Sequence, residues 1–110
     1  MKIVVVCVRD IRANLFGNPI FVNSLGHALR QFEDEVNRPA EDNLLYKHPA
    51  DFELYELGTF DSVSAEMELL KVPRQLTLGS SCVHQPALPA GGLRGNGASS
   101  GLGLGVDRPV

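Results

Sequence analysis

Blocks of apolar residues along the chain predict a central strand, followed by a short extended segment. Residues 3–8 are nearly all β-branched or apolar, and the charged pair Arg9-Asp10 closes the run. Such a run is typical of a strand that is buried on both faces at the centre of a sheet. Residues 19–22 form a short extended piece that begins at a proline, a residue common at strand starts and sheet edges.

A helix is predicted over residues 25–36. Asn23 or Ser24 can cap its first turn, because a short side-chain oxygen accepts from exposed backbone N–H groups. Asn37 followed by Arg38-Pro39 ends it, since proline cannot continue a helix and restrains the residue before it. The apolar side chains recur at the spacing of one helix face, at Leu25, Ala28, Leu29, Phe32 and Val36.

Residues 47–61 hold two of the five phenylalanines and one of the two tyrosines, and they predict an interior strand. Apolar side chains occupy both faces over residues 52–60, which suits a position covered on two sides. Gly58 inside this strand indicates a bulge or a close approach of the backbone. After a turn, residues 66–72 return as a partner strand that Pro73 ends.

Together these elements predict an α+β fold: a small three- to four-stranded mixed or antiparallel sheet packed against one main helix. The predicted domain spans residues 1–79. Residues 80–110 are expected to form a flexible, disordered tail, because seven of the 11 glycines lie in the last twenty residues. This segment lacks the aromatic and β-branched side chains whose burial offsets the entropy of ordering. A domain of ~80 residues has a thin core, so dimerisation would support it.

Charge differs between the two segments. The chain has 10 Lys and Arg against 13 Asp and Glu, a net charge of −3. Eight of the basic and twelve of the acidic residues lie in residues 1–79, which gives the domain a net charge of −4. Because nucleic-acid binding usually requires a basic face, this balance counts against general binding of phosphate backbones and leaves only a local patch.

The two cysteines do not indicate a disulfide framework. Cys7 lies in the first apolar strand and Cys82 in the predicted tail, without CxxC spacing. A buried, reduced thiol is expected for Cys7. The apolar N-terminal run is too short for a signal peptide, and no segment approaches the ~20 apolar residues of a membrane span. The cytoplasm is therefore the expected location.

No catalytic or ligand-binding motif is complete in this sequence. The glycine-rich residues 95–97 and 101–105 lack the preceding strand and following helix of a phosphate-binding loop. The three histidines lack ligand spacing, so neither a metal nor a cofactor is expected. Asp10, Asp51 and Asp61 flank strands and could meet at one sheet end, but turn and cap roles explain them equally well. We assign no catalytic residue and expect a protein that is not an enzyme.

Five basic residues are the candidate nucleic-acid contacts. Arg9 and Arg12 follow the first strand, Arg30 lies on the outer helix face, and Arg38 and Lys47 bracket the connection after the helix. If these residues cluster, they form a small basic patch that can touch phosphate or an acidic protein surface. The alternative is scattered charge that only favours solubility.

Several short segments in combination resemble a known family. The strongest is Lys47-His48-Pro49-Ala50-Asp51-Phe52, which continues as Leu54-Tyr55-Glu56-Leu57-Gly58-Thr59-Phe60-Asp61. Arg9-Asp10 and the helix segment Glu35-Val36-Asn37 match as well. Over residues 1–79 the sequence resembles the small nonstructural protein of gokushovirus-type microviruses, which are icosahedral single-stranded DNA phages. The turn after Asp61 and the extension over residues 80–110 depart from the family pattern.

The resemblance implies a phage accessory protein that is made during infection and is absent from the finished capsid. It implies a role in viral single-stranded DNA synthesis or genome packaging, through single-stranded DNA or the replication or packaging complex, in the host cytoplasm and away from membranes. It carries over no binding or catalytic residue. The alternative is an interaction module that modulates a host or viral protein, which the acidic balance favours. A homodimer remains open.

Overall fold

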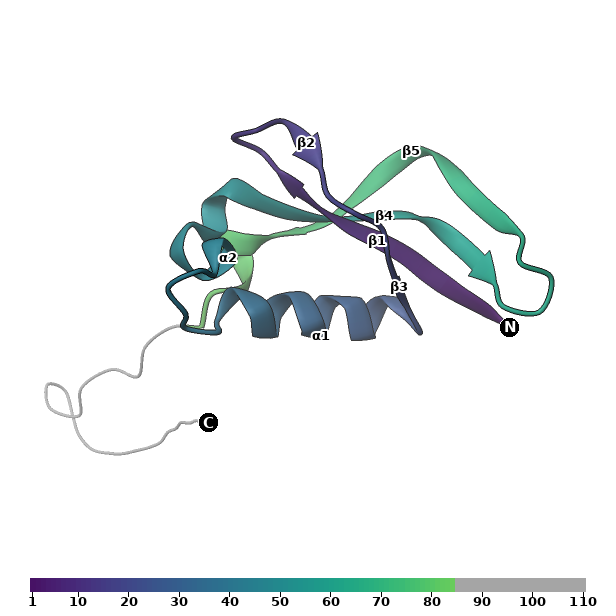
Figure 1. The fold of residues 1–110 in the computed structure, drawn as a ribbon, viewed down its shortest axis with the longest axis horizontal. Helices are drawn as coiled ribbons and strands as arrows, with labels where there is room; N and C mark the ends of the chain where they lie inside the picture. Colours follow the sequence, from purple (N-terminus) through teal and green to yellow (C-terminus); the bar gives the residue numbers. More distant parts are fainter. Residues whose placement is uncertain (85–110) are drawn as a thin grey trace, which may run out of the picture.

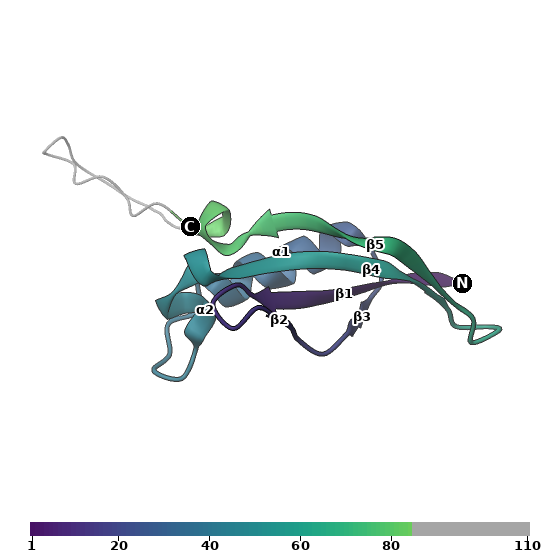
Figure 2. The same ribbon diagram turned by 90° about the horizontal axis from the view of Figure 1, so that it is seen from above.

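An antiparallel sheet that curls and one long helix form the two layers of this protein (Figures 1 and 2). The computed structural model describes residues 1–84. Their pairings are all antiparallel, which confirms the predicted α+β class. The elements in order are β1 (Lys2–Asp10), β2 (Leu15–Phe16), β3 (Ile20–Val22), α1 (Leu25–Val36), α2 (Leu44–Lys47), the 3₁₀ turn η1 (Pro49–Asp51), β4 (Phe52–Asp61), β5 (Met67–Leu78) and the 3₁₀ turn η2 (Gly79–Cys82).

Strand β1 lies at the centre of the sheet, as predicted. It pairs with β4 along its whole length, from Lys2 opposite Asp61 to Asp10 opposite Phe52. Its other edge is shared by the short strands β3 and β2, and residues 17–19 connect these two without joining the sheet. Strand β5 follows β4, so the order across the sheet is β2-β1-β4-β5 with β3 beside β1.

Helix α1 covers one face of the sheet and begins and ends where the sequence predicts. The Ser24 side-chain oxygen accepts from the His27 N–H at 3.1 Å, and Asn37 follows the last turn. The helix face at Ala28, Phe32 and Val36 is buried, because apolar side chains of the sheet meet it there. The core formed in this way consists of Val6, Val22, Ala28, Phe32, Val36 and Leu54.

Strand β5 is longer than predicted. We expected it to end at Pro73, but it runs through that residue to Leu78. Proline is tolerated because β5 is the edge strand of the sheet, where a missing N–H breaks no ladder. Residues 70–73 also arch away from β4: Gly58 pairs with Leu69 and Glu56 with Arg74, so this arch stands opposite a single residue of β4.

The described residues continue past the predicted domain end at residue 79. Turn η2 follows β5 directly, and the Asn37 side-chain amide donates to the Cys82 carbonyl oxygen at 2.9 Å. The His84 N–H donates to the amide oxygen of the same Asn37 at 2.9 Å. Residues 80–84 are thus held against the end of α1. The remainder of the predicted tail, from residue 85 on, lies outside the described residues.

Candidate functional site

The sheet face turned away from α1 carries aromatic side chains in two pairs. Residues opposite one another in antiparallel strands point to the same face, so the register places these rings together. The Phe16 and Tyr55 ring centroids are 5.2 Å apart, and those of Phe21 and Phe60 are 5.4 Å apart, both edge to face. We call this surface the open face; its large apolar side chains are Ile3, Phe16, Phe21, Tyr55, Phe60, Met67 and Leu69.

Each aromatic pair bridges β1, because one ring comes from β2 or β3 and the other from β4. Val5 and Cys7 on β1 are consequently 1% and 0% exposed, although no helix covers them. Burial raises the pKa of the Cys7 thiol, because the thiolate would lose its hydration. Cys7 is free and buried, as expected. The first strand was predicted to be buried on both faces. Helix α1 covers one face of β1, and these aromatic rings cover the other.

One end of the open face, which we call the charged end, holds a polar network around Arg9. Arg9 Nη1 lies 2.9 Å from Glu53 Oε2, and its Nη2 donates to the Asn14 side-chain oxygen. The Gln75 amide donates to the other Glu53 oxygen at 2.5 Å, which satisfies a carboxylate that is only 7% exposed as a residue. The Arg9 guanidinium carbon also lies 5.6 Å from the Phe16 ring centroid. Arg9 is therefore a fixed cation whose charge Glu53 largely neutralises.

The tip of the β1–β2 hairpin adds an exposed cation to the charged end. The Arg12 side chain is 80% exposed, and its Nη1 lies 4.0 Å from Asp51 Oδ2, the outer limit of an ion pair. Asp10 accepts from the Ala13 N–H at 3.1 Å and so fixes the hairpin turn. Phe16, at the foot of the turn, is 49% exposed. An exposed ring beside an arginine guanidinium is an arrangement on which an unpaired nucleobase can stack.

The other candidate cations lie elsewhere. Arg38 is held by Glu35 at 2.6 Å, and this hydrogen bond lowers the pKa of the Glu35 carboxyl. Lys47 on α2 donates to the Glu41 carbonyl oxygen at 3.0 Å. Arg30 is exposed on α1, in the other layer. The structure brings Arg9 and Arg12 together at the charged end, but the five candidates do not share one face.

The three aspartates considered for catalysis are also separated. Asp10 and Asp51 lie at the charged end, where the Ile11 N–H donates to the Asp51 carbonyl oxygen at 2.8 Å. Asp61 is at the opposite end of the sheet, where its backbone lies opposite Lys2 in the β1–β4 ladder. Among residues 1–84, no group of three His, Cys, Asp or Glu side chains is placed to hold a metal ion. No helix in the same range has the length and apolar character needed to cross a membrane.

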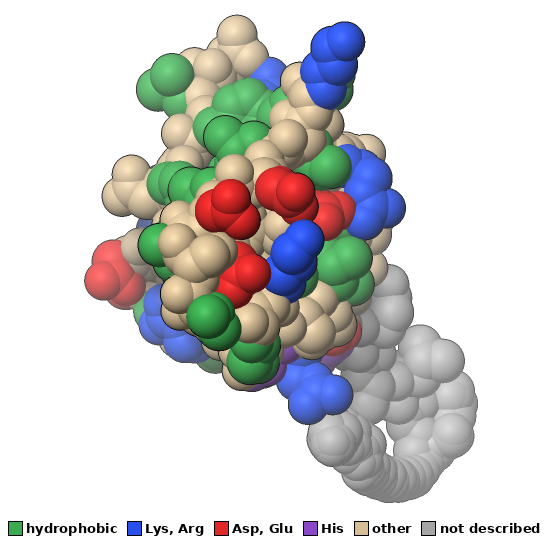
Figure 3. All heavy atoms as spheres, turned by 90° about the vertical axis from the view of Figure 1, so that its right-hand side faces the viewer, with side chains coloured by type: hydrophobic (Ala, Val, Ile, Leu, Met, Phe, Trp, Pro, Cys, Tyr) green, Lys and Arg blue, Asp and Glu red, His purple; other side chains and the backbone are tan. Residues whose placement is uncertain are grey.

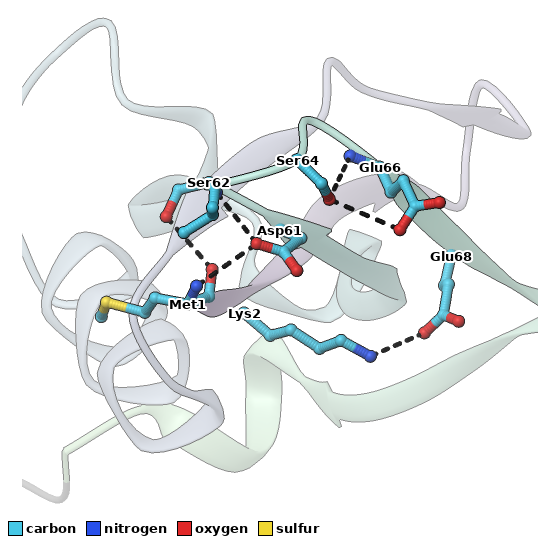
Figure 4. A network of polar contacts seen from close by, with 8 residues as sticks. Met1, Lys2, Asp61, Ser62, Ser64, Glu66 and Glu68 are labelled. Atoms are coloured by element: carbon cyan, nitrogen blue, oxygen red, sulfur yellow. Dashed lines mark hydrogen bonds and ion pairs between the residues drawn. The ribbon is translucent and has the colours of Figure 1, made fainter.

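The opposite end, at the β4–β5 turn, carries several carboxylates, two of which are paired with cations. Figure 3 looks onto it and shows acidic side chains lying close together beside apolar ones. Asp61 accepts from the Val63 N–H at 2.9 Å and lies 3.3 Å from the N-terminal ammonium group, while Glu68 binds Lys2 at 3.1 Å (Figure 4). These contacts fix the turn.

The open face was not predicted from the sequence. Phe16 and Phe21 lie outside any strongly patterned strand, and their partners on β4 were assigned only to an interior strand. A period-two signal exists within β4, but it is interrupted at Leu57, the residue opposite the β5 arch. The aromatic row follows from the register, which the sequence pattern alone does not define.

Comparison with known protein families identifies a match. Residues 3–82 match a family described as Phage ORF5 protein, a range that extends from β1 to the end of η2. No curated protein and no solved structure matches the chain.

Proposed function

This chain belongs to the Phage ORF5 protein family, and we propose that it is a nonstructural accessory protein of a gokushovirus-type microvirus. Family membership makes it a phage protein. The finer assignment is supported by the segments at residues 47–52 and 54–61 that resemble the gokushovirus protein. In this proposal the protein acts without catalysis in the host cytoplasm, in viral single-stranded DNA synthesis or genome packaging.

Single-stranded DNA is the proposed ligand of the charged end. The observation that carries this proposal is the half-exposed Phe16 ring beside the fixed Arg9 guanidinium, with the exposed Arg12 side chain on the same β1–β2 hairpin. An unpaired base offers a flat surface to Phe16, and stacking on an aromatic side chain contributes ~1–3 kcal/mol per base. Arg12 supplies a charge for the adjacent phosphate.

The acidic domain limits the electrostatic contribution to this binding. Arg12 is the most exposed cation at the charged end, whereas Glu53 already neutralises Arg9. A complex that neutralises one or two phosphates of a single strand changes log K with log salt at a slope of roughly −0.7 to −1.4. We therefore expect weak binding with a shallow salt dependence, in which stacking supplies much of the free energy.

Fluorescence anisotropy with a labelled oligothymidine, at two salt concentrations, tests this proposal on the full chain. Phe16→Ala is expected to weaken binding roughly 5- to 150-fold, the equivalent of the ~1–3 kcal/mol of one stacked base. Arg12→Gln is expected to make the salt slope shallower by about 0.7. The matched control is Arg30→Gln, the same charge change in the other layer, which should leave binding unchanged. Absence of salt-sensitive binding, or an equal effect of Arg30→Gln, would contradict the proposal.

The second candidate function is an interaction module for a host or viral protein. A crevice of about 440 Å³ opens between α1 and the β1 side of the sheet, with apolar walls that include Ile20, Phe32 and Leu45. Asp34 and Glu35 line it as well, which favours a basic amphipathic segment. A tagged chain recovered from infected cells should carry such a partner, and Ile20→Asp should lose it. Recovery of the same protein by both versions would contradict binding in the crevice.

A further inference from the structure

The half of the open face nearest the β4–β5 turn is uniformly apolar. We call it the apolar half, and by strand register it consists of Ile3, Phe21, Phe60, Met67 and Leu69 around the buried Val5 and Gly58. Phe21 and Met67 are each 47% exposed and Leu69 is 65% exposed. Large side chains that remain half exposed on a contiguous surface mark a site of association.

The size of this surface matches a small protein–protein interface. Aromatic side chains bury ~150–250 Å² when fully covered, so each large side chain that is half exposed leaves on the order of 100 Å². Phe21, Met67 and Leu69 together leave roughly 300 Å² on each copy, or about 600 Å² for two copies. The half-buried residues Ile3 and Phe60, with the rim of the contact, extend this toward the ~1,000 Å² that a specific interface needs.

We propose that a second copy of this chain covers the apolar half, so that two sheets pack face to face about a twofold axis. A twofold contact brings the same surface of both copies together, and a surface without charged side chains does so without like-charge repulsion. At the adjoining turn the carboxylates of Asp61, Glu66 and Glu68 outnumber the two cations there, the N-terminal ammonium group and Lys2. This end therefore offers no net positive charge to attract a nucleic acid or an anionic membrane.

The sheet edges are less suited to self-association than its face. One edge consists of β2 and β3, which are two and three residues long. The other edge is β5, in which Pro73 and the arch at residues 70–73 interrupt the row of backbone groups that another strand would need. Among the described residues, the face therefore offers the larger regular surface. This inference does not rest on DNA binding, because the apolar half is separate from Arg9 and Arg12.

Sedimentation velocity of the full chain from about 1 to 200 μM tests the dimer. We expect a concentration-dependent shift from one to two chain masses. Leu69→Lys places a charge within the contact and should weaken dimerisation at least tenfold, with an unchanged circular-dichroism spectrum. The matched control is Leu44→Lys on α2, where the wild-type leucine is 54% exposed, and it should dimerise normally.

A second measurement separates this result from loss of folding. The unfolding midpoint should rise with protein concentration for the wild type and for Leu44→Lys, but not for Leu69→Lys. Anisotropy with oligothymidine should still detect binding by Leu69→Lys, so failure of one proposal is distinguishable from failure of the other. The proposed dimer would be overturned by a chain that stays monomeric at the highest concentration, or by a series of species larger than two chains. The same loss of dimerisation in Leu69→Lys and Leu44→Lys would also contradict it.

Discussion

At the scale of single residues, Gly58 is the position within residues 1–84 where backbone geometry restricts the side chain most severely. Its φ is +157°, and a Cβ added there would collide with the Glu68 carbonyl oxygen and lie 2.8 Å from the Leu69 Cα. Strand β5 approaches β4 this closely where the register shifts between Glu56 and Gly58. The bulge or close approach expected from the sequence is therefore present.

Gly58→Ala should lower the free energy of unfolding by about 2 kcal/mol or more, because it adds both backbone strain and a backbone clash. Urea unfolding followed by circular dichroism measures this change. Gly26→Ala is the control: the nearest atom to its added Cβ is the Ser24 oxygen at 3.9 Å, and alanine in a helix gains up to ~1 kcal/mol over glycine. Equal stability of the Gly58→Ala variant and the wild type would show that β5 can move away.

Sequence patterns predicted residue roles where the cause is local. Ser24 as a cap and Asn37 as the helix end depend on neighbours within four residues, and both predictions are confirmed. The charge state of a candidate cation can depend on a distant partner instead. Glu53 and Glu35 neutralise Arg9 and Arg38, and only the former pairing requires the fold, since β4 must lie beside β1. A contact of that kind has no signature in a single sequence.

At the scale of elements, the β4–β5 turn is fixed by polar contacts rather than by apolar packing. The Asp61 carboxylate accepts from the Val63 N–H, and the N-terminal ammonium group lies beside it. The backbone hydrogen bond, followed by the ammonium group, lowers the pKa of Asp61 below its usual 3.8. The Ser62 N–H and hydroxyl both donate to the Met1 carbonyl oxygen, at 2.9 and 3.1 Å.

This turn should be sensitive to acid. The folded-state pKa of Asp61 lies below the unfolded one, so its stabilising effect is fully present above about pH 4 and is lost as pH falls through the lowered value. The difference in melting temperature between the wild type and Asp61→Asn should be constant from pH 7 to 5 and shrink below pH 4. Thermal scans at pH 2.5–7 measure it. A difference that persists unchanged at pH 2.5 would exclude this role.

Strand β5 shows how an element can be predicted in kind but not in extent. A proline usually ends a strand, and residues 66–72 were assigned on that basis. The arch at residues 70–73 removes the conflict, because it takes the proline out of the ladder before pairing resumes at Arg74. The arch follows from the close β4–β5 approach at Gly58, a tertiary contact, so the local pattern could not reveal it.

At the scale of the whole molecule, the helix and the return of the chain after β5 hold the two layers together. The Asn37 side-chain amide forms hydrogen bonds with the backbone of Cys82 and His84, which follow β5. Cys82 also packs against the core, as Leu76 does. The fold class was predictable because apolar period and length distinguish strands from helices. The open face was not, because it depends on which strands become neighbours and in which register.

A chain that ends at residue 79 should be less stable than one that ends at residue 84. The shorter chain loses the Cys82 packing and the two hydrogen bonds that Asn37 makes with Cys82 and His84, each of which contributes roughly 0.5–1.5 kcal/mol. Urea unfolding of both chains beside the full-length protein measures the difference. Equal midpoints would place the stabilising boundary at residue 79, as the sequence suggested.

The central place of β1 has a consequence for the order of events during synthesis. β1 leaves the ribosome first, but its full-length partner β4 ends at Asp61, and β5 completes the sheet only at Leu78. Because synthesis adds roughly 5–20 residues per second, the apolar strand β1 is exposed for on the order of seconds before β4 has been made. Nonlocal pairing of this kind is also slow to form. Until then β1 can pair only with the short strands β2 and β3, so one edge of residues 3–8 stays open in the nascent chain.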